Sequence, residues 1–391
     1  MDPFVEPATV ADPSPSASIV SRWQLAKAYV LGSIFQALLS LLPLYRLTRW
    51  KYGWPPGIVT THERIKTRGG HSLKLIILQP GVRAATRPKG VKEGGPLPVI
   101  INAHGSGFVL PCHGTDVDLL AETAARLGIC AIDADYRHSP RHSFPSPIED
   151  LVDVIKWVRS QPHRFDPDRI VMSGFSAGGN IVMGATAILS KEADQDRTTV
   201  DDLPVLNRQD SIPVPADQVL RARPGGSKES STGQSDDDVK WDAPGPIAGL
   251  VLFYPPTDLS IGPWNRPPAP CQQVAVGIST SGQSRRWLDG CYLRTKADQE
   301  DWRASPIKVG PRSWPRVVWI ACGDADPLWV QADAFISKLK SVHHPDVNLY
   351  TAPRMAHAWD KLAKVNGLGW SERKEAYRQY IQAVERAITP I

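Results

Sequence analysis

The 391-residue chain lacks any concentration of charge that would mark a nucleic-acid-binding protein. Its formal net charge is only +5, and Lys and Arg are scattered rather than clustered. Basic patches that bind nucleic acid are usually dense stretches or stripes of these residues. The charge pattern therefore favours ordinary solubility, and we expect no nucleic-acid partner.

Cysteine is also scarce, and its pattern excludes two further classes. The five cysteines are odd in number and irregularly spaced, which argues against a disulfide framework and for a reducing compartment. No Cys-x-x-Cys pair or His/Cys cluster has metal-ligand spacing, so we expect no metal and no cofactor. No Asn-x-Ser/Thr sequon occurs, which disfavours the secretory lumen. These absences predict an intracellular protein, either cytoplasmic or associated with a membrane such as that of the endoplasmic reticulum.

Two stretches have too few apolar residues to form a core. Residues 1–18 are rich in Pro, Ser, Ala and Asp and are predicted to be disordered. Residues from about 191 to 245 are rich in Asp, Ser, Gly, Pro and Gln. This composition predicts a disordered surface insertion rather than a domain. No internal repeat is visible.

Residues 28–45 contain no charged side chain, and they form the centre of a predicted helical segment over 19–57. Eighteen uncharged positions are at the lower limit for a bilayer span. No small-residue cleavage site follows, so the stretch is not typical of a cleaved signal peptide. Weakly polar residues recur at helical spacing at Gly32, Gln36 and Ser40. Three interpretations stay open: a membrane anchor, an interfacial helix in contact with a membrane, and a helix that covers a pocket.

From residue 58 onward, strand-like and helix-like patterns alternate. Short apolar runs predict strands at 73–78, 97–102, 129–133, 170–172, 247–253, 316–321 and 347–350. Helical spacing predicts helices at 116–127 and 147–159, from the turn after residue 176 to about 189, and at 333–339 and 371–388. This alternation predicts an α/β domain over 58–391, with a central, mostly parallel sheet and helices on both faces.

The most specific motif lies in Arg169–Ile188, where Gly174-Phe175-Ser176-Ala177-Gly178 follows a strand and precedes a helix. Gly-x-Ser-x-Gly in this context is a nucleophile elbow, in which the serine adopts a strained backbone conformation. The flanking glycines lack the Cβ atoms that would collide with the strand and the helix. The helix N-terminus directs free N–H groups toward the serine. Ser176 is therefore a candidate nucleophile.

Two further segments, and a single histidine, supply the remaining groups of a serine hydrolase. His104-Gly105-Ser106-Gly107 follows the strand at 97–102, and Asp326 follows the strand at 316–321. His357 lies past the last strand. Parallel sheets build their sites at the carboxyl ends of their strands. The order Ser, acid, His along the chain is that of α/β-hydrolases.

On these motifs the chain resembles the hormone-sensitive-lipase-like branch of the α/β-hydrolase fold, the fold-3 type of serine esterase. The resemblance covers about residues 95–190 and 247–385. It includes further matched residues, namely Tyr136-Arg137, Pro140, Phe144-Pro145, Pro147, Asp150 and Ala304-Ser305-Pro306. It implies an α/β-hydrolase fold with a helical cap, built from the chain before residue 58 and from about 255–305.

The resemblance also implies roles for individual residues. Ser176 would attack an ester carbonyl, His357 would accept its proton, and Asp326 would orient the imidazole. The expected activity is hydrolysis of a short-chain acyl ester, a small molecule such as a lipid or secondary metabolite. Backbone N–H groups would form the oxyanion hole at Ser106, Gly107 and Ala177.

Several alternatives remain at this stage. Asp324 competes with Asp326, although the Asp-Pro-Leu sequence favours the latter. Ser106 replaces a glycine of the family motif, which raises the question of whether the backbone there needs glycine. Amide or lactone hydrolysis could use the same groups, and a hydrolase-like protein could bind a ligand without catalysis. Retention of His357 favours an enzyme, and the sequence does not give the oligomeric state.

Overall fold

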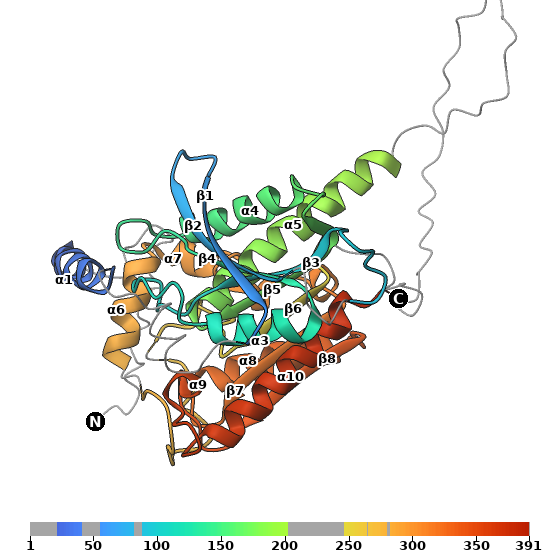
Figure 1. Ribbon diagram of the computed structural model, residues 1–391. Coiled ribbons are helices and arrows are strands. Elements are labelled where there is room, and N and C mark those ends of the chain that lie inside the picture. Colours follow the sequence, from blue (N-terminus) through green and yellow to red (C-terminus); the bar gives the residue numbers. More distant parts are fainter. Residues whose placement is uncertain are drawn as a thin grey trace, which may run out of the picture.

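The computed structural model describes residues 22–40, 55–81, 88–201, 246–263, 265–279 and 282–390. Its centre is an eight-stranded sheet in the order β1-β2-β4-β3-β5-β6-β7-β8 (Figure 1). The pairs β1–β2 and β2–β4 are antiparallel, and every other neighbouring pair is parallel. The strands are β1 (Ile58–Lys66), β2 (Ser72–Pro80), β3 (Leu97–Ala103), β4 (Cys130–Ala134), β5 (Phe165–Phe175), β6 (Gly249–Phe253), β7 (Val317–Gly323) and β8 (Asp346–Ala352).

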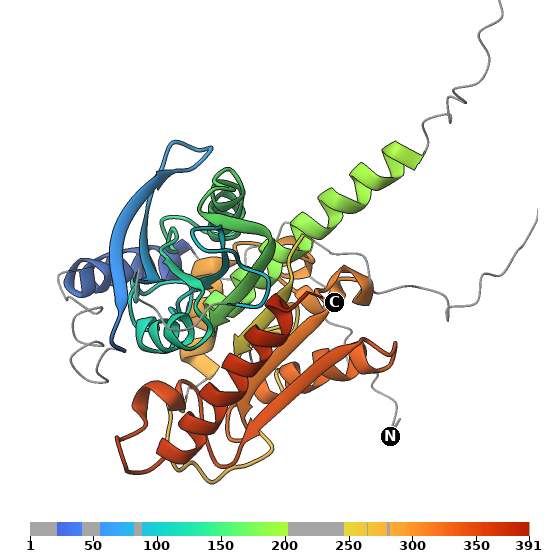
Figure 2. The ribbon, with the colours of Figure 1, turned by 45° about the vertical axis from the view of Figure 1, so that its right-hand side comes forward.

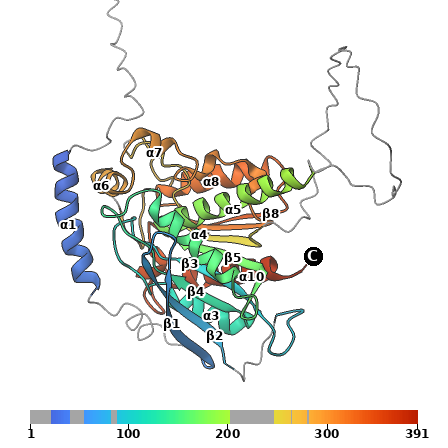
Figure 3. The same ribbon diagram turned by 90° about the horizontal axis from the view of Figure 1, so that it is seen from above.

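Helices cover both faces of the sheet, as the sequence predicts. Helices α3 and α10 pack on one face, and α4, α5 and α8 lie on the other (Figure 3). The central strands β4, β6 and β7 are buried along their whole length. Such continuous apolar runs are expected where helices cover a parallel sheet on both sides. The bounds of these helices are α3 (Val117–Leu127), α4 (Ser146–Arg159), α5 (Ala177–Asp201), α8 (Leu328–Lys340) and α10 (Trp370–Ile388).

Two details differ from the sequence predictions. The sequence did not predict β1, because this edge strand pairs on one side only and Ile58–Lys66 is largely polar. Helix α5 runs through Asp201, so the predicted disordered insertion does not begin at residue 191. Propagating a helix adds one hydrogen bond per residue, and its polar end projects beyond the sheet (Figure 2). Residues 202–245 and 1–18 lie outside the described residues.

The first described helix, α1 (Arg22–Ser40), lies beside α6 (Gly282–Tyr292), within the predicted cap region (Figure 3). Gln36 Nε2 donates to the backbone oxygens of Val109 and Ser139, each at 2.8 Å. Gly32 is buried against Pro140, with no room for a large side chain. These contacts attach α1 to the body of the molecule beside the cap.

No helix in the described ranges is long and apolar enough to cross a membrane. The last residues of the uncharged stretch, 41–45, lie outside those ranges. The second part of the cap region contains α6 and the short helix α7 (Lys296–Glu300). Three small helical elements remain in the described ranges: the 3-10 turns Pro306–Lys308 and Pro311–Ser313 before β7, and α9 (Trp359–Leu362) after β8.

Candidate active site

Ser176 occupies the sharp turn between β5 and α5. Its φ is 51°, in the left-handed region that non-glycine residues rarely adopt. The Ser176 N–H donates to Phe253 O at 2.9 Å, which holds the turn against β6. A Cβ at Gly178 would lie 2.1 Å from Ala103 O, so only glycine allows this close approach. The local structure therefore matches the elbow that the sequence predicts.

Ser176, His357 and Asp326 lie in one line of hydrogen bonds. Ser176 Oγ is 2.8 Å from His357 Nε2, and His357 Nδ1 is 2.7 Å from Asp326 Oδ2. A carboxylate can only accept, so the imidazole proton belongs on Nδ1 and Nε2 is free to accept the serine proton. Asp326 is buried, and its second oxygen accepts the Leu328 N–H at 2.9 Å. Three segments far apart in sequence thus meet at the carboxyl ends of β5, β7 and β8.

Asp324, the competing acid, points elsewhere. Its Oδ1 accepts the backbone N–H of Arg354 at 2.5 Å. This bond ties the loop after β7 to the loop after β8. Of the two aspartates, the geometry brings Asp326 to the histidine.

The pKa of His357 reflects two opposing effects. Burial lowers it, but the charge and hydrogen bond of Asp326, with a smaller contribution from Asp360, outweigh burial and raise the pKa above 6.5. The ring of Tyr254 packs against the imidazole edge-on, with centroids 4.7 Å apart. Imidazolium formation, which the transfer of the serine proton requires, is favoured in this setting.

Three backbone N–H groups next to Ser176 have no protein acceptor within the described ranges. They are those of Ser106, Gly107 and Ala177, the residues that the sequence predicts for an oxyanion hole. All three residues line the same cavity as Ser176. Ala177 is the first residue of α5, where an N–H has no partner inside the helix. Free donors beside a nucleophile can stabilise an oxyanion.

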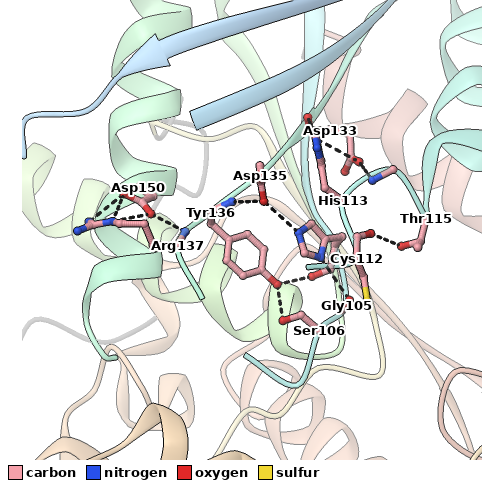
Figure 4. Close-up of polar contacts among 12 residues, drawn as sticks. Gly105, Ser106, Cys112, His113, Thr115, Asp133, Asp135, Tyr136, Arg137 and Asp150 are labelled. Atoms are coloured by element: carbon pink, nitrogen blue, oxygen red, sulfur yellow. Dashed lines mark hydrogen bonds and ion pairs between the residues drawn. The ribbon is translucent and has the colours of Figure 1, made fainter. Parts of the chain in front are cut away.

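Ser106 does not need to be glycine. The left-handed φ values in this loop belong to Gly107 and Phe108, at 57° and 66°. Ser106 Oγ lies 2.7 Å from the Tyr136 hydroxyl (Figure 4). It also accepts the Phe108 N–H at 2.9 Å. The Tyr136 hydroxyl also lies 2.6 Å from His104 O, to which it donates. The Ser106 side chain therefore has one hydrogen-bond partner in its own loop, Phe108, and one in the chain after β4, Tyr136.

Gly107 is constrained by the cap. A Cβ there would lie 2.9 Å from Cδ2 of Leu288 in α6. Its positive φ also favours glycine. The cap helix therefore packs directly on the loop that carries the free N–H groups.

Arg137 and Asp150, which are among the residues that carry the family resemblance, support this region from outside. The Arg137 backbone N–H and Nε both donate to the Asp150 carboxylate, at 2.8 and 2.9 Å (Figure 4). Asp150 is fully buried in α4. The pair fixes the chain after β4, which carries Tyr136.

One group of potential metal ligands forms that the sequence spacing did not predict. Ligand atoms of His104, Asp135 and His138 lie within 4.8 Å of one another. Burial lowers the pKa of His104, but Asp135 outweighs it and raises that pKa above 6.5, whereas burial lowers the pKa of His138 to about 3. Asp135 Oδ1 already accepts the Tyr136 N–H at 3.0 Å and lies 3.6 Å from His104 Nε2. Through these contacts the group supports the loop that carries Tyr136.

The free N–H groups and Ser176 open into a cavity of about 510 Å³. Much of its wall is apolar, from Phe108, Leu110, Phe175, Leu259, Ile278 and Leu288. Charged side chains also reach it, from Asp116, Arg266, Arg285, Asp289 and Lys361. The sequence did not predict these charged residues as part of the site, because no motif marks them and the packing of the cap brings several of them to the cavity. The size suits a small organic ligand.

Comparison with known proteins agrees with this architecture. A family model described as alpha/beta hydrolase fold matches residues 100–361. The chain is similar to the versiconal hemiacetal acetate esterase of Dothistroma septosporum, with 33% identity over 102 residues, or 26% of this chain and 31% of that protein. It is also similar to the carboxylic ester hydrolase LipN of Mycobacterium tuberculosis, with 30% identity over 312 residues, or 76% of this chain and 66% of that protein.

The fold is shared with a solved structure of much lower sequence identity. The esterase of Pyrobaculum calidifontis aligns with a TM-score of 0.63 at 19% identity, covering 92% of each chain. The alignments with the two curated relatives span only 31% and 66% of those proteins' own lengths. On the matched family model, the sheet and the elbow, the chain belongs to the α/β-hydrolase fold family, in its hormone-sensitive-lipase-like branch.

Proposed function

We propose that the protein is a serine carboxylester hydrolase with Ser176 as nucleophile, His357 as general base and Asp326 as the orienting acid. The observation that carries this proposal is the continuous hydrogen-bond line from Ser176 Oγ through His357 to Asp326. It meets the two geometric requirements of such a site, a nucleophile bonded to a base and a base bonded to an orienting group. Relatives named as ester hydrolases support the same class.

The reaction follows from the groups present. Ser176 Oγ attacks the ester carbonyl carbon while its proton passes to His357 Nε2, and Asp326 stabilises the imidazolium. The carbonyl oxygen becomes an oxyanion, which the N–H groups of Ser106, Gly107 and Ala177 bind. Each such donor typically contributes about 3 kcal/mol to lowering the barrier. His357 then protonates the leaving alcohol, and a water molecule hydrolyses the acyl-enzyme by the same steps in reverse.

We propose a small-molecule substrate with a short acyl group, an ester of a lipid or secondary metabolite. The cavity of about 510 Å³ and its largely apolar wall support this size and character. Amide or lactone hydrolysis on the same groups is the second candidate, since the nucleophile and base would be identical. A non-catalytic ligand-binding role is disfavoured, because Ser176, His357 and Asp326 are all retained and linked by hydrogen bonds.

We propose that α1 also contacts a membrane surface from inside the cell. Trp23, Val30 and Ile34 are more than half exposed and lie on one face of this helix. An apolar helix face next to a site for apolar esters suits interfacial attachment. The five cysteines, none of them in a disulfide, agree with an intracellular location.

The decisive variant is Ser176→Ala, assayed on 4-nitrophenyl esters of increasing acyl length. We expect kcat to fall by about 10⁴- to 10⁶-fold while circular dichroism stays unchanged. The parent enzyme should prefer short acyl chains. Turnover near that of the parent in a folded Ser176→Ala protein would refute the assignment.

A further inference from the structure

The cap contributes two arginines to the cavity wall, and they differ in their hydrogen-bond and ion-pair partners. Arg266 is nearly buried, and its guanidinium is held by Asp289 and donates to Ile261 O. Arg285, in the first turns of α6, lines the same cavity. Its Nε is buried, and no hydrogen bond or ion pair within the described ranges engages it.

The nearby carboxylates are committed to other partners. Asp289 is paired with Arg266, so these two charges cancel. Asp326 is close enough to raise the pKa of Arg285, but its two oxygens serve His357 and the Leu328 N–H. Burial and Arg266 together lower the pKa of Arg285 below its ordinary value. Within the described ranges, Arg285 therefore reaches the cavity wall without a carboxylate in direct contact with its guanidinium.

A partly desolvated guanidinium without a partner is costly, and a bound anion would relieve that cost. The fork of an arginine matches the two oxygens of a carboxylate. Apolar side chains line the same cavity, among them Leu288, one helical turn from Arg285 in α6, and Ile278. This combination suits a ligand with an apolar body and a single carboxylate.

We propose that Arg285 is a specificity-determining residue that binds a free carboxylate of the substrate, so that the preferred substrates are esters that also carry an organic carboxylate. This proposal rests on the proposed esterase function. Arg285 takes no part in the chemistry at the ester carbonyl. It positions one end of the substrate while Ser176 attacks the other.

The test compares anionic and neutral esters in the full-length protein. Mono-4-nitrophenyl glutarate carries the carboxylate on its acyl part, and 4-acetoxybenzoate carries it on its leaving group. Their neutral counterparts are 4-nitrophenyl pentanoate and 4-nitrophenyl acetate. In Arg285→Gln we expect the ratio of kcat/KM for one anionic ester to that for its neutral counterpart to fall by about 10- to 100-fold. Arg285→Lys keeps the charge but loses the paired donors of the guanidinium. Its ratio should therefore lie between that of the parent and that of Arg285→Gln.

Arg286→Gln is the matched control, since Arg286 is exposed, adjacent on α6, and does not line the cavity. Its ratios should equal those of the parent. Equal losses on anionic and neutral esters in Arg285→Gln, or unchanged ratios for both pairs, would overturn the proposal.

A binding measurement separates this proposal from the esterase assignment. Calorimetry of mono-4-nitrophenyl glutarate with Ser176→Ala should show tighter binding than with the double variant Ser176→Ala/Arg285→Gln, by about tenfold or more. Equal affinities would refute the role of Arg285 even if the parent hydrolyses esters. A parent that hydrolyses neither the anionic nor the neutral esters would instead refute the esterase assignment, whatever the affinities show.

Discussion

Asp324 and Asp326 are separated by a single residue, yet their surroundings assign them different tasks. Asp326 is buried and bonded to His357, whereas Asp324 holds the backbone of Arg354. We predict that Asp326→Asn lowers kcat by about 10⁴-fold, because an amide would favour the wrong imidazole tautomer. Asp324→Asn should leave kcat near that of the parent. Steady-state kinetics of the two variants measures this difference, and a larger loss in the Asp324 variant would show that we have assigned the acid wrongly.

The raised pKa of His357 predicts a pH dependence. Only neutral imidazole can accept the Ser176 proton, so activity is lost as pH falls through the pKa of His357. Because that pKa is raised above 6.5, the acid limb of kcat/KM should have its midpoint above pH 6.5. A pH–rate profile on a neutral ester measures it. A midpoint well below 6.5 would mean that Asp326 does not interact with the free enzyme's histidine as the structure indicates.

The candidate catalytic residues could be identified in the sequence because their signals are local. Ser176 lies in a motif whose glycines are required by the turn itself, and His357 and Asp326 follow predicted strands. Arg266 and Arg285 could not be predicted, since they reach the cavity only through the packing of the cap. The sequence also could not show how Ser106 is accommodated in place of glycine, because its partner Tyr136 is 30 residues away.

At the scale of elements, α1 packs against the cap helix α6 and against loops near the cavity. Gln36 satisfies two carbonyl oxygens in the loops near the cavity, and α1 packs beside α6, which supplies Arg285 and Leu288. The sequence predicted most strands and helices from their apolar patterns. It did not decide between the interpretations of the N-terminal segment, because an anchor, an interfacial helix and a cap helix share the same uncharged composition.

Removing α1 tests its contribution to the cavity. We predict that a chain starting at Pro55 loses about tenfold in kcat/KM on bulky esters, because two carbonyl groups lose their partner and α6 loses a neighbour. Gln36→Ala should reproduce part of this loss. Flotation with lipid vesicles, measured in parallel, tests membrane contact, which the truncation should abolish. Unchanged kinetics and unchanged flotation in the truncated protein would refute both roles of α1.

At the scale of the whole molecule, a buried ion pair joins two helices that are far apart in the sequence. Arg373 in α10 pairs with Asp118 in α3, and both side chains are less than a tenth exposed. We predict that Arg373→Met lowers the free energy of unfolding by about 3–5 kcal/mol, because it leaves a buried carboxylate without its partner. The double variant Arg373→Met/Asp118→Leu should recover much of this loss. Urea denaturation measures both, and equal stability of Arg373→Met and the parent would contradict the prediction.

The sheet topology explains why distant segments form one site. Ser176, Asp326 and His357 each follow a parallel strand, and the carboxyl ends of these strands lie at one edge of the sheet. The alternation of strands and helices predicted the mostly parallel sheet, but not the edge strand β1 or the full length of α5. β1 and the C-terminal part of α5 are polar, so neither has the apolar periodicity by which elements are recognised in a sequence.

The central claim is that Ser176 is the activated nucleophile, and active-site labelling tests it most directly. The protein is treated with a fluorophosphonate, and the adduct is located by mass spectrometry of its peptides while ester hydrolysis is followed. We predict a single adduct on Ser176, formed in step with the loss of activity, and no adduct in Ser176→Ala or in parent protein unfolded before treatment. Hydrolysis that persists after complete labelling of Ser176, or an inactivating adduct on another residue, would contradict the account.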